Sequence, residues 1–242
     1  MKRRNFVLAG AVLTASLPGG SLISAQAQTP ETISPGPADA LIVIDMQNDF
    51  LPGGSLAVAE GDKIIGPIGE IARQFQNVVL TQDWHPADHI SFASQHGGRK
   101  PFDVINLPYG AQVLWPTHCV QGTRGAKFAD DIDSDLAQLI IRKGYHRSID
   151  SYSAFLEADR KTQTGLAGYL KDRGITNVYL CGLATDFCVA WSALDGRAFG
   201  FNVWVIEDAT KGIDLNGSLA AAWEKMTKAG VRRIRSTDIL RP

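Results

Sequence analysis

The sequence predicts an α/β protein of three layers, in which a central, mostly parallel sheet of six strands lies between two layers of helices. Two observations lead to this prediction. Short apolar runs rich in β-branched residues recur along the chain, and stretches with helical spacing of apolar residues alternate with them. Unbroken apolar runs are typical of strands buried on both faces, as parallel strands between helices are.

The expected elements follow one another without an internal repeat. Strands are expected at residues 41–44, 77–80, 139–141, 177–180, 203–206 and 231–234. Helices are expected at residues 62–76, 166–173, 185–200 and 218–229. Gly174 and Gly230 follow two of these helices, where glycine commonly ends a helix. The stretch from about residue 83 to 135 is too long for an ordinary connection, which indicates a functional segment.

The first 27 residues have the organisation of an export signal. Basic residues at 2–4 precede an apolar run at 6–17 and a small-x-small cleavage site at 25–27. The paired arginines, followed by Asn-Phe-Val, resemble a twin-arginine signal, which implies a periplasmic or otherwise exported protein. A plain secretory signal or an uncleaved anchor is the alternative.

The remaining sequence divides into a leader and one domain. Residues 28–39 are rich in Pro, Ser and Thr and predict a flexible leader, and residues 40–242 predict a single domain. The formal net charge of −1 argues against nucleic acid or an anionic membrane as the main partner. After residue 40 no segment is apolar enough to span a bilayer.

Three reactive side chains follow three of the expected strands, where ligands bind in parallel sheets. Asp45 directly follows the first strand, Lys143 follows the third, and Cys188 lies in the first turn of the helix after the fourth. A helix start and a nearby cation both favour a thiolate, and backbone N–H groups there can hold an oxyanion. Each residue alone fits an ordinary structural role, but together they predict a nucleophile, an acid/base and a cation in one pocket.

The cysteine count adds a second indication. The chain has three cysteines, so at least one is unpaired within the chain. Cys181, on a strand, is expected to pack in the core, and Cys119 is expected to be structural. Cys188 is the cysteine whose position indicates chemistry.

A group of acidic and imidazole side chains predicts a metal site. Asp83 and His85 are two residues apart after the second strand, so in extended backbone they point to the same side. His118 would return from the long segment as a third ligand. Such a set, leaving positions open to water or substrate, suits one divalent ion: zinc, iron or manganese. The alternative is that these histidines make ordinary hydrogen bonds, above all His89 and His96.

Several short motifs carry a family resemblance across residues 40–235. They are DMQNDF at 45–50, GGSL at 53–56, QDWHP at 82–86, SFAS at 91–94, WPTHCV at 115–120, DSYSAF at 150–155 and GLATDFCV at 182–189. In this order they resemble the nicotinamidase/pyrazinamidase branch of the isochorismatase-like cysteine hydrolases. The resemblance implies the isochorismatase-like hydrolase fold for residues 40–242.

The resemblance also implies roles for the residues already singled out. Cys188 is implied as the nucleophile, Asp45 as the proton acceptor and donor, and Lys143 as the partner that tunes their charges. The implied metal ligands are Asp83, His85 and His118, with His89 as a further ligand, direct or through water.

The resemblance implies the substrate-binding groups as well. Backbone N–H groups of Ala184 and Cys188 would form an oxyanion hole, with a cis peptide between Leu183 and Ala184. Phe50, Trp115 and Leu183 are implied as substrate-binding residues, the first two on either side of a pyridine ring.

The implied reaction hydrolyses nicotinamide to nicotinate and ammonia through a thioester, in NAD salvage, and extends to pyrazinamide. Family members are usually cytoplasmic, so the export signal departs from the pattern. Two other functions stay open: a cysteine amidohydrolase of the same fold acting on a carbamoyl or ureido substrate, and a non-catalytic exported metal-binding protein. The sequence predicts a small-molecule partner and leaves a homo-oligomer open.

Overall fold

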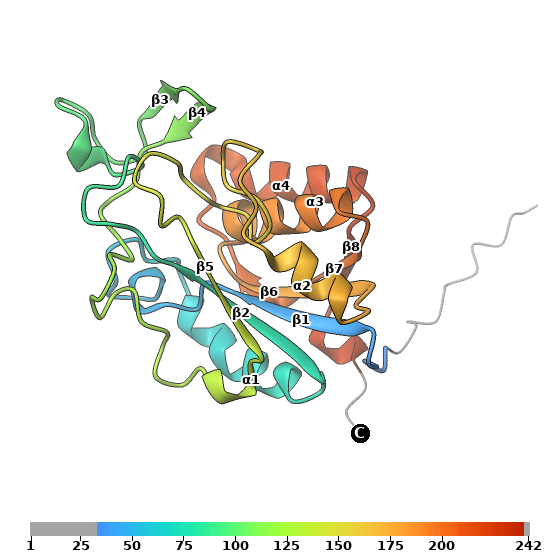
Figure 1. Cartoon of the computed structure of the whole chain (residues 1–242). Coiled ribbons are helices and arrows are strands. Elements are labelled where there is room, and N and C mark those ends of the chain that lie inside the picture. Colours follow the sequence, from blue (N-terminus) through green and yellow to red (C-terminus); the bar gives the residue numbers. More distant parts are fainter. Residues whose placement is uncertain (1–32, 240–242) are drawn as a thin grey trace, which may run out of the picture. The chain divides into compact units, whose positions relative to one another are not determined.

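The computed structural model describes residues 33–239, and within them a six-stranded parallel sheet forms the centre of the fold (Figure 1). The strand order is β5-β2-β1-β6-β7-β8, and every neighbouring pair is parallel. Along the chain, β2 and β5 are added on one side of β1, and β6, β7 and β8 are then added on its other side. A crevice is therefore expected at the carboxyl ends of β1 and β6, where the direction of winding changes.

The strands of the sheet are longer than their apolar runs. They are β1 (Asp39–Ile44), β2 (Asn77–Asp83), β5 (Leu139–Lys143), β6 (Asn177–Leu183), β7 (Asn202–Lys211) and β8 (Arg232–Ile234). The polar residues that end β2 and β5 continue the backbone ladder although they break the apolar pattern. Asp83 and Lys143 thus lie within their strands, where the sequence predicted them just beyond.

Helices cover both faces of the sheet, as the three-layer prediction requires. They are α1 (Ile65–Ala72), α2 (Leu166–Asp172), α3 (Ala190–Ala198) and α4 (Ser218–Lys228). Buried residues of α1 pack with one set of strand side chains, and those of α2, α3 and α4 pack with the opposite set. In Figure 1, α1 lies on one side of the sheet and the other three helices on the other.

The predicted helix at residues 62–76 is shorter than its apolar pattern. A 3-10 turn at Gly61–Ile64 precedes α1, which ends at Ala72. Gln74 and Phe75 continue in turns closed by backbone bonds to Ile71 and Ala72. Phe75 is still buried against the sheet, so the apolar spacing of the sequence continues three residues beyond the end of the helix at Ala72.

The long middle segment contains a hairpin that the sequence did not predict, made of β3 (Val104–Leu107) and β4 (Gly110–Val113). The strands are four residues long and largely exposed, so they lack the apolar runs that mark the central sheet. The hairpin stands apart from the central sheet, beyond its β5 and β2 side, in Figure 1.

The start of the described chain is fixed to its end. Ile33 bridges to Ile239, and its backbone N–H donates to Asp238 at 2.6 Å. Residues 33–39, part of the predicted leader, thus make backbone contacts with the domain, while the predicted signal at 1–27 lies outside the described residues. Within residues 33–239 no helix has the length and apolar character needed to cross a membrane.

Candidate active site

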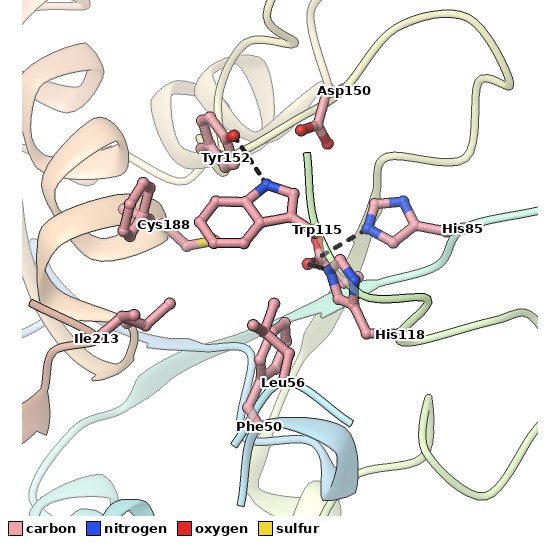
Figure 2. A pocket seen from close by; sticks show the side chains of 12 residues that line it. Phe50, Leu56, His85, Trp115, His118, Asp150, Tyr152, Cys188 and Ile213 are labelled. Carbon is pink, nitrogen blue, oxygen red and sulfur yellow. Dashed lines mark hydrogen bonds and ion pairs between the residues drawn. The ribbon is translucent and has the colours of Figure 1, made fainter. Parts of the chain in front are cut away.

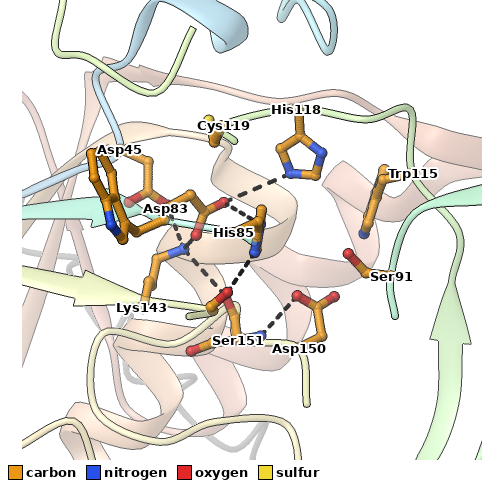
Figure 3. A network of polar contacts seen from close by, with 12 residues as sticks. Asp45, Asp83, His85, Ser91, Trp115, His118, Cys119, Lys143, Asp150 and Ser151 are labelled. Carbon is orange, nitrogen blue, oxygen red and sulfur yellow. Dashed lines mark hydrogen bonds and ion pairs between the residues drawn. The ribbon is translucent and has the colours of Figure 1, made fainter. Parts of the chain in front are cut away.

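Four side chains meet at the carboxyl edge of the sheet, each at or just beyond the end of a different parallel strand. Figure 3 shows three of them, Asp45, Asp83 and Lys143. Lys143 Nζ lies 2.7 Å from Asp45 Oδ2 and 3.4 Å from Cys188 Sγ, and it also pairs with Asp83 Oδ1. Carboxylate oxygens of Asp45 and Asp83 and the Cys188 sulfur lie within 4.8 Å of one another. The structure therefore brings together the three residues predicted from the strand ends and adds Asp83 to them.

Asp45 is held in an unusual backbone conformation. Its φ of 47° lies in the left-handed region, which costs a non-glycine residue about 1–2 kcal/mol. Thr81 fixes it there, because its hydroxyl accepts from the Asp45 N–H at 3.1 Å and donates to Oδ1 at 2.6 Å. Oδ2 pairs with the Lys143 ammonium at 2.7 Å. A carboxylate oxygen of Asp45 lies within 4.8 Å of the Cys188 sulfur, so the carboxyl is close enough to serve as its base.

Burial dominates the protonation of Asp45. It raises the pKa of this carboxyl to about 6, against the lowering effect of the Lys143 charge and with a further rise from Asp83. For Asp83, burial also acts to raise the pKa, but the charges of Lys143 and His85 outweigh it and hold the pKa below the usual range. The two carboxylates around one ammonium are thus unequal, and Asp45 is the one that can exchange a proton near neutral pH.

Cys188 lies in a π-helical turn, Thr185–Val189, that leads from β6 into α3. The sequence predicted that the helix start and Lys143 would favour its thiolate. Burial instead raises the pKa of the thiol well above its ordinary value, and Lys143 only partly opposes this because Asp45 and Asp83 act the other way. The resting thiol keeps its proton, so the site needs a base to remove it.

The predicted metal ligands form a compact donor set on the same edge. One ligand atom each from Asp83, His85 and His118 lies within 4.8 Å of the others. His85 Nδ1 contacts Gly144 O at 2.7 Å and His118 Nδ1 contacts Pro116 O at 2.8 Å. Because carbonyl oxygens only accept, both Nδ1 atoms carry a proton, and Nε2 is left to face Asp83 Oδ2, at 3.6 Å and 3.9 Å.

This donor set fits a divalent ion. Two Nε2 lone pairs and a carboxylate oxygen converge in a buried space, an arrangement that can hold a divalent cation between them. Backbone carbonyls fix the tautomers, as they do for metal-binding histidines generally. Gly144 makes room for one ligand: its φ is +64°, and a Cβ there would lie 2.4 Å from His85 Cε1.

His89 does not join this donor set. Its Nε2 contacts Ile149 O at 3.1 Å and its Nδ1 contacts Ser91 Oγ at 2.7 Å, so both nitrogens already have partners in the protein, although one of them lies within 4.8 Å of ligand atoms of His85 and Asp150. Its ring stacks on His85 at 4.2 Å, and burial, together with the charge of His85, lowers its pKa to about 4. His96 contacts Ile90 O at 2.7 Å. Both therefore make ordinary hydrogen bonds, the alternative considered from the sequence.

An aromatic pocket opens above these groups (Figure 2). The space among its lining atoms is about 340 Å³, which includes the solvent at its open mouth. Its lining consists of Phe50, Leu56, Asp83, His85, Trp115, His118, Asp150, Tyr152, Ala184, Phe187, Cys188 and Ile213. The pocket thus connects the thiol with the metal-ligand set.

The predicted substrate-binding residues are placed differently from one another. Phe50 and Trp115 line the pocket, as expected of residues that hold a ring. Leu183 does not: its side chain is fully buried in the apolar core on the α1 side of the sheet. It enters the site through its backbone, because the Leu183–Ala184 peptide is cis, as the resemblance implied. Ala184, at the other end of that peptide, does line the pocket.

Sequence reasoning missed several pocket residues. Tyr152 accepts a hydrogen bond from Trp115 Nε1 at 3.0 Å, and Phe187 stands at right angles to Trp115, 4.9 Å away. Both lie in motifs that carried the resemblance, so the motifs themselves were the available signal. Asp150 also lies in one of these motifs and was not assigned a role. Gln112 of β4 lies outside the motifs, and nothing in the sequence indicated a role for it near the pocket.

All three cysteines are free and buried. Cys181 and Cys119 pack in the apolar core, as predicted, and burial raises the pKa of both thiols. Only Cys188 lines the pocket.

Fold and site together define a hydrolase with a three-layer α/β fold and a buried cysteine at the carboxyl edge of its parallel sheet. The isochorismatase domain matches residues 39–238, which is nearly all of the described chain. The nicotinamidase of Acinetobacter baylyi is 62% identical over 201 residues, covering 83% of this chain and 94% of that protein. The chain belongs to the isochorismatase family.

Solved structures agree with this placement. The nicotinamidase/pyrazinamidase of Acinetobacter baumannii has a TM-score of 0.83 at 62% identity, covering 84% of this chain and 98% of that one. PnC1 from L. infantum, solved with nicotinate, has a TM-score of 0.76 at 38% identity and covers 86% and 98%. A pyrazinamidase of Pyrococcus horikoshii, solved with zinc, has a TM-score of 0.67 at 40% identity and covers 82% and 99%.

Proposed function

We propose that this protein is a nicotinamidase that hydrolyses nicotinamide to nicotinate and ammonia. One observation carries the proposal: a buried thiol, a carboxylate with a raised pKa and an ammonium meet at the base of an aromatic pocket that also holds two imidazoles and a carboxylate. The pocket offers a ring-binding space between Phe50 and Trp115 and a nucleophile beneath it. A flat heteroaromatic amide matches both.

Asp45 acts first as the base. Its ionised Oδ2 takes the thiol proton of Cys188 while Lys143 stays charged beside both groups. Burial alone would lower the pKa of Lys143, but the charges of Asp45 and Asp83 outweigh it and raise this pKa well above its ordinary value, so Lys143 keeps its proton. Its positive charge then stabilises the thiolate as it forms.

The thiolate then attacks the amide carbon, and a carbon–sulfur bond forms. The negative oxygen of the tetrahedral intermediate faces the backbone N–H groups of Ala184, just before the π-helical turn, and of Cys188, within it. When the carbon–nitrogen bond breaks, Asp45 returns its proton to the leaving nitrogen, which departs as ammonia. Water, deprotonated by Asp45, hydrolyses the thioester and restores the thiol.

An ion held by the metal-ligand set would fix the orientation of the substrate in the pocket. Asp83, His85 and His118 would hold one divalent ion, for which zinc, iron and manganese are the candidates. Such an ion would supply a Lewis acid for a ring nitrogen of the substrate. Phe50 and Trp115 then exclude water from the ring faces. The zinc in the Pyrococcus horikoshii protein supports the choice of ion.

The test is ammonia release from nicotinamide by the purified protein, with and without a chelator. We expect metal-dependent turnover, lost by at least about 10⁴-fold in Cys188→Ala. Nicotinamide binding to Cys188→Ala, measured by calorimetry, should persist and shows that the pocket is intact. Turnover of a carbamoyl or ureido amide instead of nicotinamide, or ion binding without any turnover, would favour the two alternative functions and overturn this one.

Two further proposals extend the function. We propose that pyrazinamide is also hydrolysed, because its ring and carboxamide have the same outline, and the same assay tests it. We also propose that the twin-arginine sequence at 1–27 exports the folded enzyme, with external nicotinamide as its substrate in NAD salvage. Cell fractionation checks this, since replacing both arginines with lysine should keep the protein in the cytoplasm.

A further inference from the structure

A third carboxylate of the pocket has no part in the mechanism above. Asp150 lies between β5 and α2, is 2% exposed, and lines the pocket together with Asp83 and His118. Figure 2 shows its carboxylate at the rim of the pocket beyond Trp115, and Figure 3 shows it on the side of His85 that faces away from Lys143. A buried, pocket-facing carboxylate needs an explanation because its desolvation is costly.

The carboxylate is held in place from two sides. Oδ1 accepts from the Ser151 backbone N–H at 2.8 Å, and Oδ2 accepts from Gln112 Nε2 at 2.6 Å. Gln112 is itself buried, and Tyr109 donates to its Oε1 at 3.0 Å, which fixes the amide with its nitrogen toward Asp150. The orientation of Asp150 therefore depends on the β3–β4 hairpin.

No lysine or arginine pairs with Asp150 within the described chain, and the ionisable side chains beside it are the imidazoles of His85 and His89. Among residues 33–239 it forms no ion pair, and the pocket lining includes neither lysine nor arginine. Lys143, the one ammonium at the site, is already shared by Asp45 and Asp83. When the three carboxyls are ionised and the imidazoles are neutral, three carboxylates around one ammonium leave two negative charges, equal in size to the charge of one divalent ion.

Asp150 is near the metal-ligand set but outside it. One of its oxygens lies within 4.8 Å of nitrogens of both His85 and His89, yet it does not belong to the Asp83, His85 and His118 group. A carboxylate at this position would reach an ion on Asp83, His85 and His118 through a coordinated water. Such outer partners orient ligands and strengthen ion binding.

We propose that Asp150 is a positioning residue of the ion site, which accepts a hydrogen bond from water bound to the ion, and that Gln112 holds it in that position. This inference rests on the proposed function, because it presupposes an ion on Asp83, His85 and His118. It gives the hairpin a role in ion binding, although no residue of the hairpin is a ligand.

The test measures zinc affinity of the full chain after chelator treatment, by competition with a chelating dye. Asp150→Asn should weaken zinc binding about 10- to 100-fold, the usual effect of losing an outer partner. Gln112→Met should weaken it in the same direction by less, and it replaces Asp150→Asn if that variant fails to fold. Asp195→Asn is the matched control: it removes a buried carboxylate that pairs with Arg160, away from the pocket, and should leave zinc affinity unchanged.

Asp83→Asn distinguishes an error in the role of Asp150 from an error in the position of the ion site. If Asp83→Asn abolishes zinc binding while Asp150→Asn and Gln112→Met bind like the unaltered protein, this inference is wrong and the ion site stands. If Asp83→Asn also binds normally, the ion site itself is misplaced and the inference falls with it.

Discussion

The two sides of the active site reach the same pocket by different means. On one side, Asp83 pairs directly with Lys143 across β2 and β5, so the register of a parallel sheet sets their distance. On the other side, Trp115 and His118 come from the long segment between β2 and β5. Their positions depend on single contacts, such as the bond from Trp115 N–H to Ser91 O at 2.8 Å and the bridge between His85 and Val120. The sheet places the groups that carry charge, and the long segment places the groups that hold the ring and complete the ion site.

The largest effect is expected on the sheet side, in Lys143→Met. Losing the ammonium leaves Asp45 and Asp83 buried without a cation, which should lower the free energy of unfolding by about 3–5 kcal/mol. Urea unfolding with chelator present measures it. Lys63→Met, which removes an exposed pair with Glu60, should cost less than about 1 kcal/mol. Equal losses in the two variants would show that the buried pairing does not stabilise the fold.

The next effect compares two histidines of the long segment. His118→Ala removes an ion ligand and should weaken zinc binding more than about 100-fold, beyond the loss of an outer partner. His89→Asn should change it less than about threefold, because both ring nitrogens of His89 are already bonded within the protein. Zinc titration of the two chelator-treated variants decides this. A larger loss in His89→Asn would make His89 a ligand after all.

A third prediction concerns the pH dependence of the sheet side. Asp45 must be ionised to accept the thiol proton, and its pKa is raised to about 6. The kcat/KM for nicotinamide should therefore fall below about pH 6, by roughly tenfold per pH unit, and level off above it. Thr81→Val removes a hydrogen bond that lowers the pKa of Asp45, so the fall should move to higher pH. An unmoved profile would point to another base.

The smallest effect is expected on the outer face of the hairpin. Val104 is 59% exposed, so Val104→Ser should change the free energy of unfolding by less than about 0.5 kcal/mol and leave kcat/KM unaltered. Thermal unfolding and the amidase assay check this. A clear loss of turnover would mean that the whole hairpin, not only its buried side chains, supports the pocket.

The difference between the two sides also explains what the sequence revealed. Apolar runs indicate buried strands, so the residues at their ends, Asp45 and Lys143, could be assigned to one edge of the sheet from the sequence alone. Asp83 could be named as an ion ligand, but its pairing with Lys143 depends on strand order, which the sequence does not state. Gln112 lay beyond prediction because its exposed, four-residue strand has no apolar pattern.

The protonation of Cys188 could not be read from its neighbours along the chain. The helix start and Lys143 both act toward a thiolate, yet full burial beside two carboxylates outweighs them. The same limit applies to His89, whose spacing from His85 suits a ligand. Only the folded chain shows Ile149 and Ser91 occupying its nitrogens.

Gly144 has a consequence for any attempt to redesign this enzyme. Its missing side chain is the space that the His85 imidazole fills, and its carbonyl keeps that ring turned toward Asp83. Position 144 is thus closed to every larger residue, even though it neither binds an ion nor touches a substrate. We expect a substitution at Gly144 to displace the His85 ring and weaken ion binding, a loss of activity easily mistaken for damage to the catalytic cysteine.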